Sequence, residues 1–248
     1  MWCGRHAGQV TMSREHLIKD EFKALLGVEA AGLATDVNVR VLPDLRRRAR
    51  SIPKPMWDLT TKRLCMECNS RSDRDIEAPA KDTLLALIQG RADGVPLLRA
   101  RPMATWAIRT ALVSAACHRG VSDLPDQLVT HLWSELRPRH GACAFFAPAF
   151  FEQPYLFEMV GAADVEGSRT TGALGVIGIG GMLLVVSDFG TWDGSVSVVA
   201  HLGLEFLDSF DVFWPPPVAQ SAPRSARLSR DEVDEAVERL RAAVPPAW

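Results

Sequence analysis

Apolar residues recur at helical spacing through the middle of the chain. The apolar positions after Asn69 fall on one side of a single helix: Ile76, Ala80, Leu84, Leu87 and Ile88. Gly90 ends that pattern. The same spacing predicts a second helix over about 101–118 and a third over about 125–136, which Pro138 ends. Because each helix has an apolar face to bury, we expect the three to pack as one unit.

Alternating apolar and polar residues predict strands on the N-terminal side of these helices. Residues 34–42, "ATDVNVRVL", alternate in this way, and residues 61–65, "TKRLC", are a shorter run that leads to the cysteine. Between them, residues 44–58 are rich in arginine and contain two prolines, which predicts a loop. Upstream, residues 16–27, "HLIKDEFKALLG", predict a short helix that ends at Gly27.

The character of the sequence changes at Gly141, where small and aromatic residues become frequent. Short runs of β-like residues follow and predict strands at Leu156–Val160, Ala173–Ile179, Met182–Val186 and Ser195–Val199. The uncharged stretch 170–187 is long enough for a marginal membrane span, but Gly180 and Gly181 divide it into two β-branched pieces. We therefore expect a buried hairpin there and no membrane helix. A proline-rich linker and an amphipathic helix over 231–243 come last.

Composition and charge are those of an ordinary globular protein: 248 residues, 47% hydrophobic, 23% charged, with a formal net charge of −2. Overall charge therefore does not draw the chain toward nucleic acid. One local basic run, "RRRAR", supplies Arg46, Arg47, Arg48 and Arg50. These arginines fit either phosphate contacts or a solvated loop. No apolar signal segment follows the charged N-terminal residues, so we expect a cytoplasmic protein.

The cysteines favour a metal site. Cys65 and Cys68 form a CxxC pair, which in a reducing compartment is more typical of metal binding than of a disulfide. A closed zinc site needs two further ligands. Upstream, Cys3 is the candidate third ligand, and His6 follows it at the same CxxC-like spacing and is the candidate fourth. The remaining cysteines, Cys117 and Cys143, are expected to be buried apolar residues.

The order "WCG…SREHL…RLCMECN" resembles the HNH, or ββα-metal, nuclease family. Members with structural zinc carry a CxxC before an acid–His pair and a second CxxC followed at once by Asn or His. The continuation "CNSRSDRDIE", with "APAKDTLLALIQG" and "MATWAIRTAL", is similar to a group of HNH-type proteins from bacteria and phages. The segment "WPPP" also fits that group.

The resemblance implies a role for each matching residue. His16 matches the general base that activates water, while Glu15 and Asn69 match ligands of a catalytic divalent ion, Mg²⁺ or Mn²⁺. A structural Zn²⁺ would be held by Cys3, Cys65, Cys68 and His6. The long gap between the acid–His pair and the second CxxC departs from a compact ββα-metal unit, and it is expected to contain an insertion with the strand at 34–42 and the arginine run.

The expected architecture is α+β in three parts. Residues 1–78 form an HNH-like zinc module with the ββα-metal fold, 79–140 a helical unit, and 141–248 an α+β region with antiparallel strands. The expected function is hydrolysis of DNA phosphodiester bonds by an HNH endonuclease, with DNA as the partner. One alternative is a catalytically degenerate zinc module that binds nucleic acid or protein without cleavage. Another is a structural domain whose cysteines bind no metal.

Overall fold

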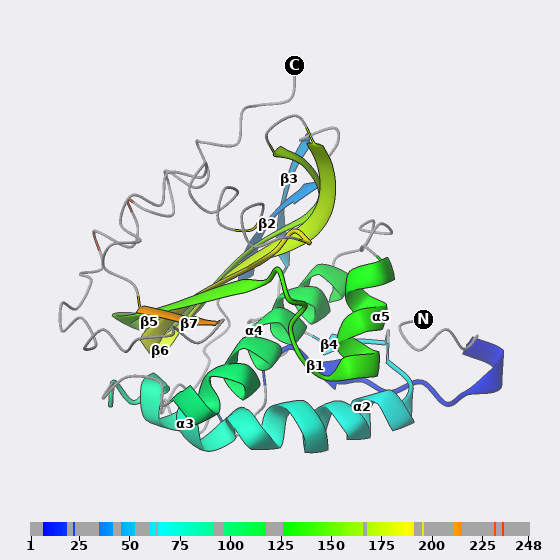
Figure 1. Ribbon diagram of the computed structural model, residues 1–248, viewed down its shortest axis with the longest axis horizontal. Coiled ribbons are helices and arrows are strands. Elements are labelled where there is room, and N and C mark those ends of the chain that lie inside the picture. The colour runs from blue at the N-terminus through cyan, green and yellow to red at the C-terminus, as the bar shows by residue number, and fades with distance from the viewer. Residues whose placement is uncertain are drawn as a thin grey trace.

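The computed structural model has an α+β fold in which helices pack against one face of a mixed β-sheet (Figure 1). The structure describes residues 7–18, 22, 35–41, 46–52, 60–62, 64–91, 97–117, 126–165, 168–190, 195, 211–214, 231 and 235. No helix in these ranges is long and apolar enough to cross a membrane. The α+β class predicted from the sequence is confirmed.

A short antiparallel pair lies near the N-terminus, after the 3₁₀ turn η1 (Ala7–Gln9). It consists of β1 (Glu15–His16) and β4 (Thr60–Thr61), with Glu15 opposite Thr61 and His16 opposite Thr60. Backbone hydrogen bonds extend the contact, because the Ser13 N–H donates to the Leu64 carbonyl and the Met66 N–H to the Thr11 carbonyl, each at 3.0 Å. The N-terminal segment therefore lies alongside the chain from β4 to the start of the helix at Met66.

That helix runs without a break through three parts, which are α2 (Met66–Ser72), the π-helical segment η3 (Asp73–Glu77) and α3 (Ala78–Ile88). It starts before Asn69, earlier than the sequence predicted, because Cys65 acts as its N-cap. The wide η3 turn comes just before Pro79. Proline has no N–H for the ladder and its ring clashes with the carbonyl four residues earlier, so a local widening is the expected response.

Two further helices confirm the central helical predictions. They are α4 (Leu97–Cys117) and α5 (Asp126–Glu135), close to the expected bounds. Trp106 on α4 and Trp133 on α5 are both buried in the core. The ring of Phe22 meets that of Trp106 edge to face at 6.4 Å between centroids. Phe22 is also helical, whereas His16 lies in β1; the rest of the helix predicted for 16–27 lies outside the described residues or is not helical.

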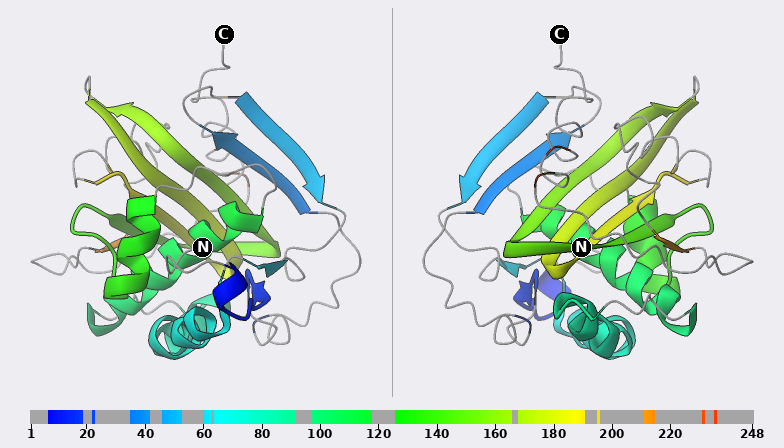
Figure 2. Two further views of the ribbon diagram at one scale, coloured as in Figure 1. Left: turned by 90° about the vertical axis from the view of Figure 1, so that its right-hand side faces the viewer. Right: turned by 90° about the vertical axis from the view of Figure 1, so that its left-hand side faces the viewer.

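The main sheet has five strands in the order β3-β2-β5-β6, with β7 also paired to β5. Their bounds are β2 (Thr35–Val41), β3 (Arg46–Ile52), β5 (Cys143–Val165), β6 (Ser168–Asp188) and β7 (Asp211–Trp214). All pairs are antiparallel except β2 with β5. The helix α4 packs across β6 and also contacts β5 and β7. Figure 2 shows β2 and β3 standing beside β5, away from the β1–β4 pair.

Two sequence predictions about this sheet were wrong. The loop expected over 44–58 contains β3, an edge strand paired with β2. Edge strands commonly carry charged residues and need no apolar alternation, so the hydrophobic pattern of residues 46–52 did not predict a strand. The hairpin expected within 170–187 is instead one continuous strand, β6, and the connection lies between Val165 and Ser168. Gly180 has a φ of 55° and lies opposite a register shift in β5, so its left-handed backbone forms a bulge and not a turn.

The other predicted β runs fall within these two long strands. Leu156–Val160 is part of β5, and Ala173–Ile179 and Met182–Val186 are parts of β6. Ser195 has helical backbone, which contradicts its prediction as a strand start, and the rest of that run lies outside the described residues. Of the amphipathic helix predicted over 231–243, Asp231 and Glu235 are described, and both are helical.

Candidate functional site

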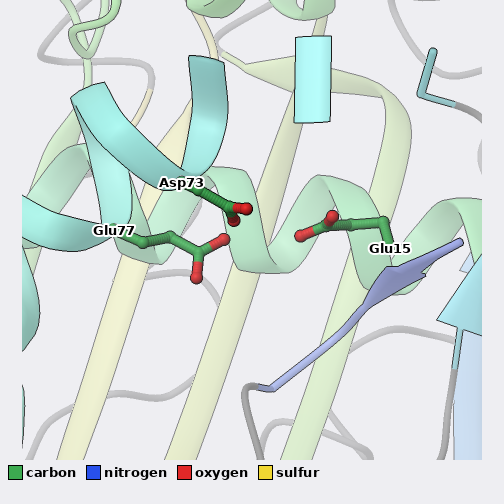
Figure 3. A group of neighbouring side chains, drawn as sticks. All are labelled: Glu15, Asp73 and Glu77. Carbon is green, nitrogen blue, oxygen red and sulfur yellow. The ribbon is translucent and has the colours of Figure 1, made fainter. Parts of the chain in front are cut away.

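Side chains from three elements meet where β1 lies against the long helix and α4. The carboxylates of Glu15 on β1, Asp73 and Glu77 on η3 place one oxygen each within 4.8 Å of one another. Figure 3 shows the Glu15 side chain extending from its strand toward the two acidic side chains of the helix. Glu15 and Glu77 are buried, whereas Asp73 is half-buried.

Arg109 of α4 connects these elements. Its Nη2 forms an ion pair with Glu15 and a second one with Glu77 at 2.9 Å. Its Nε donates to the Ser72 Oγ at 3.3 Å, and its Nη1 donates to the Leu17 carbonyl at 3.4 Å. The guanidinium is buried, with 1% of the side chain exposed. One cation therefore fixes β1 and the long helix onto α4, which suits the planar fork of arginine.

The contacts of Arg109 lie on either side of His16. Glu15 precedes this histidine and is held by its side chain, while Leu17 follows it and is held by its carbonyl. Successive residues of a strand point to opposite faces, so Glu15 faces the interior and His16 faces outward. The exposures agree, because Glu15 is buried and His16 is half-buried. The Nδ1 of His16 is shielded from solvent and has no hydrogen-bond partner among the described residues.

The CxxC pair lies at the start of the long helix. Cys65 is its N-cap, and its Sγ accepts a hydrogen bond from the Cys68 N–H at 3.4 Å. Both cysteines are buried, and neither forms a disulfide with another described residue. Their spacing of three residues places them on one helical turn, as a metal-binding pair requires. Cys3 and His6, the other predicted zinc ligands, lie outside the described residues.

Cys143 lies on β5, outside the CxxC pair, and it is buried as the sequence predicted. Burial, together with the nearby Asp188 carboxylate, raises the pKa of its thiol to about 12. Metal binding uses the thiolate, so a thiol that stays protonated at neutral pH is a poor ligand. The side chain of Cys117 is not among those described.

Asn69 occupies the same face of the helix as the acidic residues. The Asp73 N–H donates to the Asn69 carbonyl, one helical turn earlier. Residues four apart on a helix are neighbours on its surface, so Asn69 and Asp73 share one face. The side-chain Oδ1 of Asn69 is buried, and no residue in the described part of the chain forms a hydrogen bond with it. A buried carbonyl-type oxygen in that state is a suitable ligand for a cation. Asn69 and the carboxylates therefore offer oxygen ligands, the type that Mg²⁺ and Mn²⁺ prefer.

Sequence reasoning found Glu15, His16 and Asn69 but missed Asp73, Glu77 and Arg109. A signal was present, because Asn69, Asp73 and Glu77 follow one another at intervals of four residues. That spacing aligns them along one helix face. Arg109 lies within the "MATWAIRTAL" segment of the resemblance, but that segment did not predict its burial, since an arginine within an apolar helix is equally compatible with a side chain that reaches solvent.

The predicted phosphate-binding arginines belong to a different sheet from His16. Arg46, Arg47, Arg48 and Arg50 lie on β3, whereas His16 lies on the β1–β4 pair. The side chains of these four arginines are not among those described. Their DNA-binding role stays a prediction.

Comparisons of the chain with family models, curated proteins and solved structures find no match.

Proposed function

We propose that this protein is a metal-dependent HNH-type endonuclease that hydrolyses phosphodiester bonds of DNA. In this proposal β1, β4 and α2 are the strand, strand and helix of a ββα-metal unit, and residues 19–59 are an insertion between its two strands. One observation supports it above the others: the two motif segments, far apart in sequence, lie directly against each other. Glu15 pairs with Thr61, and Met12 forms a bridge with Cys65.

The proposed chemistry assigns His16 as the general base. Its half-buried imidazole lies on the outward face of β1, where a phosphodiester can approach. The imidazole takes a proton from water, the water oxygen bonds to phosphorus, and one ester P–O bond breaks as its oxygen leaves and is protonated. A Mg²⁺ or Mn²⁺ ion held by Asn69 and neighbouring carboxylates would stabilise the charge on the phosphate.

The proposed structural zinc uses the described pair Cys65 and Cys68, with Cys3 and His6 as the other ligands. The hydrogen bond from the Cys68 N–H to the Cys65 Sγ supports the assignment, because it stabilises negative charge on sulfur. Zinc here would fix the N-terminal segment to the start of the long helix, close to Asn69.

A catalytically degenerate module is the second candidate, and one observation favours it. The carboxylate of Glu15, which matches a family metal ligand, already forms an ion pair with buried Arg109. A neighbouring guanidinium competes electrostatically with a divalent ion. In this alternative, the motif keeps its shape and binds a partner without cleaving it.

Incubation of supercoiled plasmid with the protein and Mg²⁺ or Mn²⁺ tests the two candidates. We expect the wild type to nick the plasmid and His16→Ala to lose activity by a factor of about 10² to 10⁴, the usual contribution of a general base. His140→Ala is the matched control, because His140 is exposed on the connection between α5 and β5. It should cut at the wild-type rate. An intact plasmid with wild-type protein across a broad metal and salt range would favour the degenerate module.

A further inference from the structure

The outward face of the β1–β4 pair carries exposed positive charge next to His16. Arg14 and Lys62 each lie one residue beyond the Glu15–Thr61 pair, at the same end of the ribbon. Both side chains are exposed, whereas Glu15 and Thr61 are buried. Strand alternation therefore places the two cations on the face that also presents His16.

Neither cation has an acidic partner among the described residues. Other exposed arginines do: Arg74 pairs with Asp75 at 2.7 Å, and Arg137 with Glu135 at 3.5 Å. Two like charges on neighbouring strands repel each other unless an anion lies between them. An arrangement of this kind is stabilised when a phosphate group binds.

The spacing also suits a phosphodiester chain. Arg14 and His16 are two residues apart on one strand, which places them about 7 Å apart at the backbone. A long arginine side chain can therefore reach the phosphate next to the one beside His16. Charge complementarity favours a polyanionic backbone, and contacts of this kind go to phosphates and do not depend on base sequence.

We propose that Arg14 and Lys62 bind DNA phosphates on either side of the bond that His16 attacks. This inference rests on the proposed function and extends it, because it moves the DNA-binding surface from the arginines of β3 to the β1–β4 pair. The two residues are positioning residues, since they orient the backbone and take no part in proton transfer.

The test measures binding of a fluorescent duplex DNA to the His16→Ala protein at several salt concentrations. We expect Arg14→Gln/Lys62→Gln in that background to weaken binding and to make the slope of log K against log salt shallower by about 2, because each phosphate contact contributes about 0.9. Arg101→Gln/Arg137→Gln is the control: it removes the same charge from two exposed residues, on α4 and beyond α5. Its slope should stay unchanged.

Equal weakening by both double variants would overturn the inference, because net charge alone would explain the effect. A wild-type slope in Arg14→Gln/Lys62→Gln, or no DNA binding by the parent protein, would overturn it as well. Cleavage and binding separate the two proposals. A protein that binds through these cations but never cuts contradicts the nuclease, while one that cuts normally without them contradicts the phosphate assignment.

Discussion

At the scale of single residues, the buried guanidinium of Arg109 determines the arrangement of the site. Burial of a charge costs free energy that only close, well-oriented partners offset. Here Glu15 and Glu77 supply that compensation, and the Ser72 hydroxyl and Leu17 carbonyl accept further hydrogen bonds. The backbone at His16 is therefore held by contacts on both neighbouring residues.

Removal of this cation should be strongly destabilising. Arg109→Met leaves two buried carboxylates without their cation, so we expect the free energy of unfolding to fall by about 3–5 kcal/mol. Urea unfolding followed by circular dichroism measures the change. Arg101→Met on the same helix is the control, because Arg101 is exposed and should shift stability by less than about 0.5 kcal/mol. Similar losses in the two variants would contradict a structural role for the buried network.

The sequence was informative about this site only through its resemblance to the HNH motif. Glu15 and His16 were predicted as the acid–His pair downstream of Cys3, and Asn69 as the residue that follows the CxxC pair. The role of Arg109 was not predicted, because its burial depends on four partners from two distant segments, and no local pattern encodes them. Asp73 and Glu77 follow Asn69 at intervals of four residues, which places all three on one helix face. Acidic residues on a helix are usually solvated, so this spacing did not predict a site. Their contact with Glu15 on β1 is visible only in the structure.

At the scale of elements, glycines allow the long helices to approach the sheet. A Cβ added at Gly175 of β6 would lie 2.6 Å from the Cβ of Ala111 on α4. Another added at Gly181 would lie 2.5 Å from the Cα of Gly90, just after α3. The sequence predicted the helices well because their apolar faces repeat. It failed at β6, where glycines read as turn residues are in fact required for close packing and for a bulge.

The contact between α4 and β6 gives an element-scale prediction. Gly175→Ala forces a methyl group against Ala111, so we expect a loss of about 1–3 kcal/mol in the free energy of unfolding, as in other overpacked cores. Gly8→Ala is the control, since an added Cβ there meets nothing within 4 Å. Adding Ala111→Gly to Gly175→Ala should recover part of the loss. A double variant no more stable than Gly175→Ala would show that this contact is not the cause. Unfolding melts of the four proteins provide the comparison.

At the scale of the whole molecule, the structure joins parts that the sequence separates. The continuous helix from Met66 to Ile88 runs from the motif segment into the helical layer, and Arg109 connects that layer back to β1. The division into 1–78, 79–140 and 141–248 stays a prediction. The α+β class could be read from the sequence because it depends on local periodicity. The strand order could not, because β2 reaches β5 across a long stretch of chain.

The proposed zinc would act on the stability of the whole molecule, because the free energy of metal binding adds to that of folding when only the folded chain holds the site. We expect one zinc per chain by elemental analysis, and a strong chelator should lower the Tm. Cys65→Ser should lose the zinc, show a lower Tm at the outset and no longer respond to the chelator. Cys143→Ala is the matched control, because it removes a buried thiol that stays protonated and should keep the zinc. A wild-type protein that contains no zinc and melts unchanged in chelator would exclude the metal, and the motif would then depend on β1–β4 pairing and Arg109 alone.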